Sequence, residues 1–190
     1  STYLWVGSTA QGEASAAQLG AYSEDSLWRF LCALEGVSIR DIRDLLPEDL
    51  YGATLTGAIA HPSTISNIVR YQALYKYGGC WVDSDVLPLG DDLWTCGGFG
   101  AQLVCGLEQY LHFNPEHTEI SRGHQVGVGV LLAVPGLEIM RVCVENIQGW
   151  LHKYGGIPGK GTGPLYFTTG WNHFSEWDPL HMPMRMTPIG

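Results

Sequence analysis

The sequence predicts an α/β layered domain of ordinary size. It has 190 residues, 45% of them hydrophobic, which is enough to bury one core. Stretches with apolar residues at helical spacing alternate with short runs of β-type residues, and glycine or proline separates them. Strands that alternate with helices are typical of an α/β domain. We therefore expect one domain over residues 1–190.

The N-terminal third predicts two strands around one helix. Thr2–Gly7 is rich in β-type residues and predicts a strand that ends at glycine. A loop or short polar helix is expected next, and then a helix from Ser23 to Gly36 with one apolar face. Val37–Ile39 predicts a short strand. The acidic stretch Asp41–Asp49, which contains a proline, predicts irregular surface structure.

The clearest helix follows His61-Pro62. Ser63 or Thr64 is its expected cap, and Gly78-Gly79 is its expected end because glycine readily adopts a positive φ. A strand then opens at Cys80 and is expected to close at Pro88-Leu89-Gly90. Three later elements are predicted: strands near Gln102–Leu107 and Gln125–Val134, and a helix over Leu137–His152.

Charge and composition exclude several functions. Ten Lys and Arg stand against 19 Asp and Glu, for a net charge of −9, so general nucleic-acid binding is not expected. An anionic substrate would need positive charge from a metal ion. No apolar run approaches the ~20 residues of a membrane span, and no secretory signal is visible. The five cysteines form no C-x-x-C pair, which favours free thiols in a cytoplasmic or other reducing compartment.

Two aspartates mark a candidate metal site. Side chains alternate along a strand, so Asp83 and Asp85 are expected on one face with their Cα atoms ~7 Å apart. Carboxylate oxygens suit Mg²⁺ or Mn²⁺, which also bind phosphate oxygens. By itself such a pair is more often two solvated carboxylates at a turn, because Asp-x-Asp is frequent by chance.

The preceding helix adds an amide and a cation. Asn67 and Arg70 are three residues apart and therefore share one helix face. Arg70 is interpreted as a fixed cation directed at a sugar or a diphosphate, with an ordinary surface arginine as the alternative.

The segment Ser66–Asp85 resembles the Asp-x-Asp region of sugar-nucleotide glycosyltransferases, such as the yeast initiating mannosyltransferases and the large clostridial glucosylating toxins. The family pattern is Ser-Asp-x-x-Arg followed by Gly-Gly-x-Tyr-x-Asp-x-Asp, and this chain has Asn67 and Trp81 where the pattern has Asp and Tyr. The resemblance implies a GT-A-like, Rossmann-type fold, with a mixed, mostly parallel sheet and helices on both faces.

Two flanking segments extend the resemblance. Trp5 resembles the tryptophan that stacks on the uracil of a UDP-sugar, with core packing as the alternative. Gly161–Pro164 resembles the family's Thr-Gly-Pro loop. Asn172–Trp177 resembles the toxins' closing segment, which implies metal contacts from Asn172 and Ser175 and a hydrogen bond from Trp177 to the departing phosphate; His173 is a competing ligand.

The resemblance implies a glycosyltransferase that uses Mn²⁺ or Mg²⁺ and transfers a hexose with retention. A UDP-sugar is the favoured donor and GDP-mannose is possible, whereas the acceptor is open: a glycan, a protein side chain, a small molecule or a modified base. The implied catalytic residues are Asp83, Asp85, Arg70 and Trp177. The implied donor contacts are Trp5, Asn67, Arg70, Trp81, Asp83, Ser84, Thr162 and Gly163, and the implied metal ligands are Asp85, Asp83, Asn172 and Ser175.

Two other functions are considered. A sugar-nucleotide or glycan-binding module without catalysis would keep the same motif, and Asn67 favours it. A metal-dependent hydrolase with Asp83 and Asp85 as acid and base is disfavoured, because glycosidase carboxylates must flank the bond that they cut.

Overall fold

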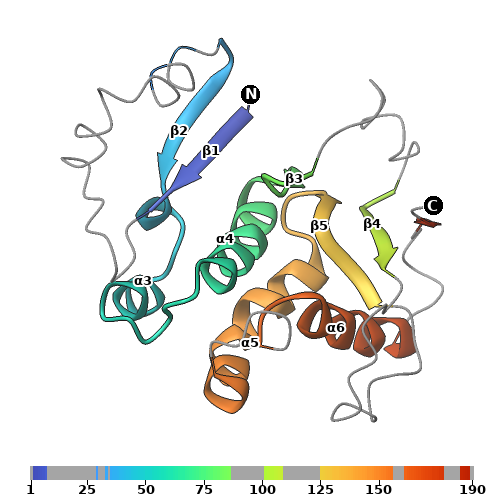
Figure 1. Cartoon of the computed structure of the whole chain (residues 1–190). Coiled ribbons are helices and arrows are strands. Elements are labelled where there is room, and N and C mark those ends of the chain that lie inside the picture. Colours follow the sequence, from blue (N-terminus) through green and yellow to red (C-terminus); the bar gives the residue numbers. More distant parts are fainter. Residues whose placement is uncertain are drawn as a thin grey trace. The chain divides into compact units, whose positions relative to one another are not determined.

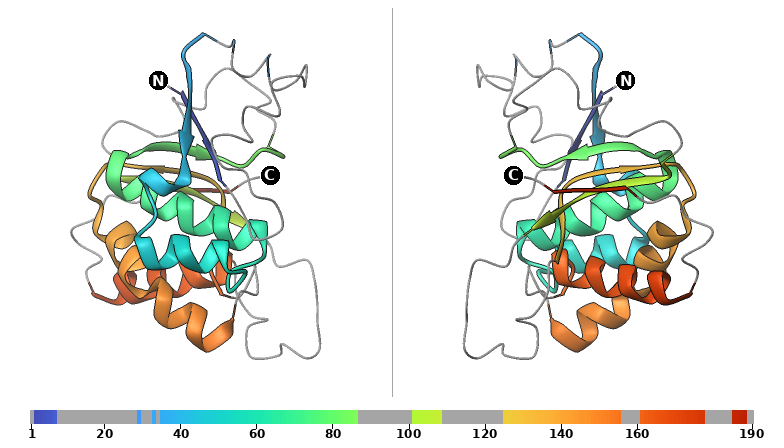
Figure 2. Two further views of the ribbon diagram at one scale, coloured as in Figure 1. Left: turned by 90° about the vertical axis from the view of Figure 1, so that its left-hand side faces the viewer. Right: turned by 90° about the vertical axis from the view of Figure 1, so that its right-hand side faces the viewer.

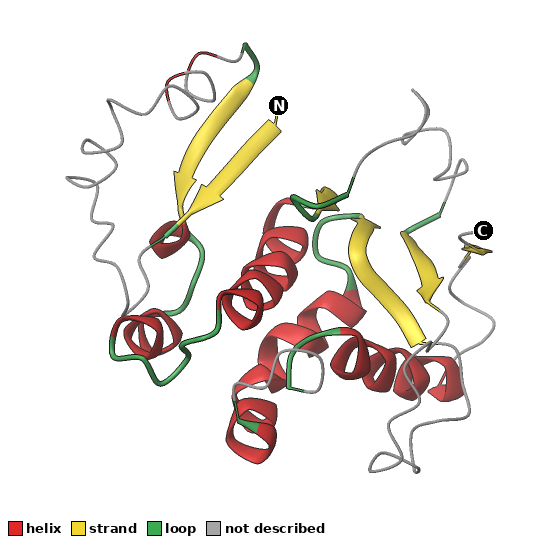
Figure 3. Cartoon of the chain, viewed as in Figure 1, coloured by secondary structure: helices red, strands yellow, loops and turns green. Residues whose placement is uncertain are grey.

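The structure, a computed structural model, describes residues 2–7, 29, 33, 35–86, 101–108, 125–155, 161–177 and 185–188. These residues form a mixed α/β protein (Figure 1, Figure 3). They divide into two compact units, Ser1–Val69 and Arg70–Gly190, and each is described by itself. Among the helices of the described residues, none is both long and apolar enough to cross a bilayer.

The N-terminal unit contains a pair of parallel strands. β1 (Thr2–Val6) pairs with β2 (Val37–Asp41), so both predicted strands are confirmed. Gly7 follows β1 at a close approach, because a Cβ there would lie 2.1 Å from Cδ1 of Ile42. The buried apolar residues that follow β2 are Ile42, Leu45, Leu46, Leu50 and Ile59.

The acidic stretch Asp41–Asp49 is partly helical, which corrects its prediction as irregular structure. It contains η2 (Ile42–Asp44) and the start of α3 (Glu48–Leu55). The carboxylate of Asp41 accepts a hydrogen bond from the backbone N–H of Arg43 at 2.8 Å and caps η2. Glu48 and Asp49 lie in the first turn of α3, where the helix dipole stabilises anions. The acidic residues of this stretch therefore lie at the starts of helices.

The long helix predicted from the sequence is α4 (Pro62–Tyr77), within which the boundary between the two units falls. It begins one residue before the expected cap at Ser63, since proline is favoured at the first helical position. Gly78 and Gly79 end it, with φ of +65° and +94°. A Cβ on Gly78 would also lie 2.6 Å from the backbone nitrogen of Pro135. Glycine is thus required where the chain turns from α4 into the sheet.

Four strands of the C-terminal unit form one sheet in the order β3-β5-β4-β6. Their bounds are Gly79–Val82 for β3, Leu103–Glu108 for β4, Gln125–Ala133 for β5 and Arg185–Pro188 for β6. β5 pairs antiparallel with both β3 and β4, and only β4 with β6 is a parallel pair among the described strands of this sheet. The expected single, mostly parallel sheet is therefore not what the described residues form. β6 was not predicted.

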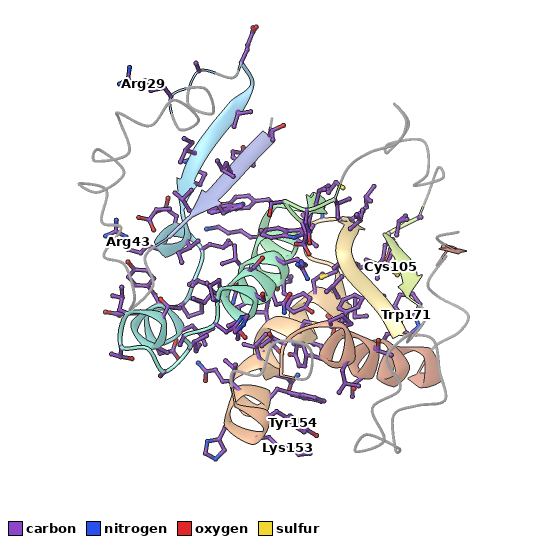
Figure 4. The ribbon with its side chains drawn as sticks, in the orientation of Figure 1. Arg29, Arg43, Cys105, Lys153, Tyr154 and Trp171 are labelled. Carbon is purple, nitrogen blue, oxygen red and sulfur yellow. The ribbon has the colours of Figure 1, made fainter. Side chains whose placement is uncertain are left out.

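Two helices accompany this sheet. α5 (Glu138–Tyr154) and α6 (Pro164–Trp177) lie on the same side of it in Figure 2, so these two described helices do not reproduce the expected arrangement on both faces. Antiparallel strands need no helical crossover, so one face of such a sheet can lack helices. The hydroxyl of Thr168 on α6 accepts a hydrogen bond from the backbone N–H of Val126 on β5 at 2.8 Å. Cys105 of β4 and Trp171 of α6, both labelled in Figure 4, are buried.

Candidate active site

The two aspartates of the Asp-x-Asp motif come directly after β3, a short strand at the edge of the sheet. β3 ends at Val82, six residues before the expected close at Pro88. The backbone N–H of Asp83 still donates to the carbonyl of Gly129 on β5 at 2.8 Å, and the N–H of Val86 then donates back to the carbonyl of Asp83 at 3.1 Å. The prediction that Asp83 and Asp85 share one strand face is therefore corrected: Asp83 follows the last residue of β3 and Asp85 belongs to the turn.

One oxygen of the Asp83 carboxylate accepts two hydrogen bonds. Nη2 of Arg70 donates to Oδ1 at 2.5 Å, and Nε1 of Trp81 donates to the same atom at 2.7 Å. The guanidinium carbon of Arg70 lies 5.4 Å from the centre of the Trp81 ring, within the range of a cation–π contact. These three side chains, hereafter the Arg70–Trp81–Asp83 cluster, join the middle of α4 to the end of β3.

The two charged side chains of this cluster differ in burial, and this difference determines how they stabilise each other. The side chain of Arg70 is 2% exposed, whereas that of Asp83 is 29% exposed. A buried guanidinium is costly without a counter-ion, so Asp83 stabilises Arg70 in its buried position. The sequence predicted that Arg70 points at a bound sugar or diphosphate; in the structure its Nη2 atom is directed at Asp83. Arg70 thereby fixes the orientation of the carboxylate.

Ser84 and Asp85 are exposed in the turn. Within the described ranges no three His, Cys, Asp or Glu side chains come together in a way that could hold a metal ion. Mg²⁺ and similar hard cations are commonly held by one or two carboxylates, with substrate phosphates and water completing the shell. An exposed carboxylate two residues after a fixed one fits that mode of binding rather than an all-protein cage.

Gly129 is a neighbour of this site that sequence reasoning missed. A Cβ at this position would lie 3.5 Å from Oδ2 of Asp83 and 3.8 Å from Cγ2 of Val86. The signal that could have revealed it is a glycine inside an otherwise apolar strand, which often marks a close approach.

Tyr71 connects the same helix to the Thr-Gly-Pro loop. Its hydroxyl donates to the carbonyl of Thr162 at 2.8 Å, and its ring stacks on Phe167 with centroids 5.8 Å apart. Burial raises the pKa of Tyr71 well above its ordinary value, so the hydroxyl remains a donor. Thr162 itself is wholly buried and Gly163 is buried as well. Pro164 begins α6, because proline is favoured at the first position of a helix.

The other predicted site residues are not part of the Arg70–Trp81–Asp83 cluster. Trp5 is half-buried on β1, and its ring centre lies 6.3 Å from that of Tyr3. Asn67 is buried on α4, three residues before Arg70, and both Trp5 and Asn67 belong to the N-terminal unit. The segment Asn172–Trp177, which includes Ser175, forms the last part of α6, and its side chains lie outside the described structure.

Comparison with protein families gives a match over part of the chain. Residues 21–92 match the family model of the glycosyltransferase sugar-binding region containing the DXD motif. The matched range contains Asn67, Arg70, Trp81, Asp83 and Asp85, whereas Trp5, Thr162 and α6 lie outside it. No curated protein matched the chain. The match covers less than half of the chain, and it supports the assignment of residues 21–92 to the DXD glycosyltransferases.

Proposed function

We propose that this protein is a metal-dependent glycosyltransferase that moves a hexose from a nucleoside diphosphate sugar to an acceptor. The observation that carries the proposal is the fixed Asp83 carboxylate, held by Arg70 and Trp81 and followed by the exposed Asp85, inside the region that matches the family. A UDP-sugar is the favoured donor and GDP-mannose is the second choice. The acceptor stays open among glycans, protein side chains, small molecules and modified bases.

The two aspartates have different roles in this proposal. The charge of Asp83 is already compensated by Arg70, so a second cation gains more from Asp85, which is exposed. Asp85 would hold Mn²⁺ or Mg²⁺, with Asn172 and Ser175 of α6 as further ligands. The bound ion would supply charge neutralisation for the leaving diphosphate. Asp83 contacts a ribose hydroxyl or a metal-bound water, and its exposed fraction supports such a contact.

The remaining donor contacts come from several elements. Trp5 stacks on the base, and Ser84 hydrogen-bonds the donor from the turn. Asn67 and Thr162 are buried, which favours an indirect role for both: they fix the backbone that faces the donor. Trp177 donates a hydrogen bond to the departing phosphate. The chain acts as one domain over residues 1–190, in a compartment that keeps its thiols reduced.

The reaction exchanges one bond for another. The bond between the anomeric carbon and the diphosphate oxygen breaks, and the acceptor oxygen bonds to the same carbon. The acceptor proton passes to the departing diphosphate. The anomeric configuration is retained, by attack on the face that the leaving group vacates. Arg70 and Trp81 act as positioning residues, because they hold the carboxylate that orients the donor.

Nucleotide release tests the proposal. The protein is incubated with UDP-glucose, UDP-GlcNAc or GDP-mannose and Mn²⁺, and free nucleoside diphosphate is measured. Release from at least one donor is expected, with loss on EDTA treatment, recovery with Mn²⁺, and loss in Asp85→Asn. If no donor binds or turns over, the enzyme proposal is wrong.

A binding module without catalysis is the second candidate. One observation favours it: the guanidinium of Arg70 is buried and already paired with Asp83. Calorimetry distinguishes the two functions. Metal-dependent binding of a donor, with neither transfer nor hydrolysis over a long incubation, would favour the binding module.

A further inference from the structure

Gly129 on β5 lies next to Oδ2 of Asp83. This is the carboxylate oxygen that accepts no hydrogen bond from Arg70 or Trp81. Among the described residues, the side-chain hydrogen bonds to this carboxylate, from Arg70 and Trp81, go to Oδ1. A Cβ on Gly129 would lie 3.5 Å from Oδ2. The two oxygens of Asp83 therefore have different surroundings: one is held by donors, and the other lies beside a residue with no side chain.

Gly129 lies where the register between β4 and β5 is irregular, between Leu131 and Val126, but neither a positive φ nor lack of space requires glycine there. Six described glycines have a positive φ, and Gly129 is not among them, so an L side chain is compatible with its backbone. The nearest atoms to an added Cβ, Oδ2 of Asp83 and Cγ2 of Val86, would be at ordinary van der Waals distances of 3.5 and 3.8 Å. A methyl group fits, yet it would cover one side of Oδ2. Glycine in a strand interior weakens the strand, and close approach of a ligand is one reason for it.

We propose that the absence of a side chain at Gly129 keeps Oδ2 of Asp83 open to an O–H donor of the bound nucleotide–metal complex. This inference rests on the proposed function and names the atom through which Asp83 meets the donor. The O–H group belongs either to a hydroxyl of the nucleotide's ribose or to a water bound to the metal. Both donate short hydrogen bonds to a carboxylate, typically about 2.5–2.7 Å in length. A side chain at position 129 would displace either one.

The experiment compares Gly129→Ala and Gly129→Val with a matched control, Gly149→Ala. Gly149 lies on α5 and an added Cβ would have no atom within 4 Å, so its substitution adds a methyl group without covering anything. Calorimetry with UDP plus Mn²⁺, and with Mn²⁺ alone, gives the affinities. Thermal unfolding of each ligand-free variant shows whether the fold is kept.

The expected result is a folded Gly129→Ala protein whose affinity for UDP–Mn²⁺ falls about tenfold, as loss of a hydrogen bond to a charged group would give. Gly129→Val lowers it further, and Gly149→Ala leaves it unchanged. If Mn²⁺ alone also binds more weakly to Gly129→Ala, the O–H group is that of a metal-bound water. If Mn²⁺ alone binds normally, it is a ribose hydroxyl.

Two results overturn the inference while the proposed function stands. One is wild-type affinity for UDP–Mn²⁺ in a folded Gly129→Ala protein. The other is failure of Gly129→Ala to fold, because the space beside Oδ2 would then serve packing rather than a ligand. A wild-type protein that binds neither UDP nor GDP with Mn²⁺ overturns the proposed function itself, and this inference with it.

Discussion

Nη2 of Arg70 lies 2.5 Å from Oδ1 of Asp83, and the two side chains differ in exposure, at 2% and 29%. The cation is thus enclosed by protein, while part of the anion remains in contact with solvent. An ion pair of this kind fixes a carboxylate at the surface from inside the core. The first two predictions follow from this asymmetry.

Substitution of the two aspartates should affect stability differently. Asp83→Asn leaves a buried guanidinium opposite a neutral amide, and we expect the free energy of unfolding to fall by about 3 kcal/mol. Asp85 is exposed in the turn, so Asp85→Asn should change it by less than about 0.5 kcal/mol. Urea unfolding of both variants measures the difference. Equal losses would show that Asp83 does not carry the buried charge.

Trp81→Phe should impair donor use more than folding. The phenyl ring keeps packing beside Arg70, but the N–H that donates to Asp83 is lost, at a cost of about 1.5 kcal/mol. We expect a higher KM for the donor, because the carboxylate is less firmly oriented. Trp150→Phe on α5 is the matched control, since Trp150 contacts Tyr154 and Tyr166 instead. An unchanged donor KM in Trp81→Phe would argue against a positioning role.

Tyr71→Phe should destabilise the protein by about 1–2 kcal/mol. The ring keeps its stacking on Phe167, but the carbonyl of the buried Thr162 loses its hydrogen-bond donor. Tyr77→Phe on the same helix is the control, because the side chain of Tyr77 is exposed and its change should be nearly neutral. Chemical unfolding of the two variants measures the difference in their free energies of unfolding. A Tyr71→Phe protein as stable as wild type would mean that the bond contributes nothing.

The elements that could be predicted from the sequence are those whose formation depends on neighbouring residues in the chain. β1, β2, α4 and the start of β3 follow from local patterns, namely β-type runs, one apolar helix face and the glycine pair Gly78-Gly79. The motif also supplied Arg70, Trp81 and Asp83 as candidate residues before their contacts were known.

What could not be predicted depends on contacts between distant segments. The antiparallel pairing of β5 with β3 and β4 is set by packing across the sheet, which periodicity does not encode. β3 ends at Val82 because the chain turns after the bond from Asp83 to Gly129. The ion pair between Arg70 and Asp83 is likewise a tertiary property.

Stability should fall at alkaline pH because two thiols of the described residues, those of Cys105 and Cys143, are buried. Burial raises the pKa of Cys143 to about 12 and that of Cys105 to about 11, from an ordinary value of 9.0. Above pH 9 the unfolded chain loses protons that the folded chain keeps. Each thiol therefore lowers the free energy of unfolding by about 1.4 kcal/mol per pH unit until its folded-state pKa is reached. Below pH 9 this contribution to stability is fully present.

Urea unfolding under reducing conditions at pH 8 and pH 10 measures this effect. Cys143→Ala is the comparison: it should be less stable at pH 8 because of the cavity, yet lose less on going to pH 10. The same loss in both proteins would contradict a buried, protonated Cys143.

The most direct test of the account is calorimetric binding of UDP in the presence of Mn²⁺ to the wild-type protein and to Asp85→Asn. We propose that the turn with Asp83 and Asp85 binds a diphosphate through a divalent cation. We predict binding to the wild type that disappears with EDTA, and at least tenfold weaker binding to an Asp85→Asn protein that unfolds at the same urea concentration. UDP binding that is equally tight in both proteins, or unaffected by removal of the metal, would contradict the claim.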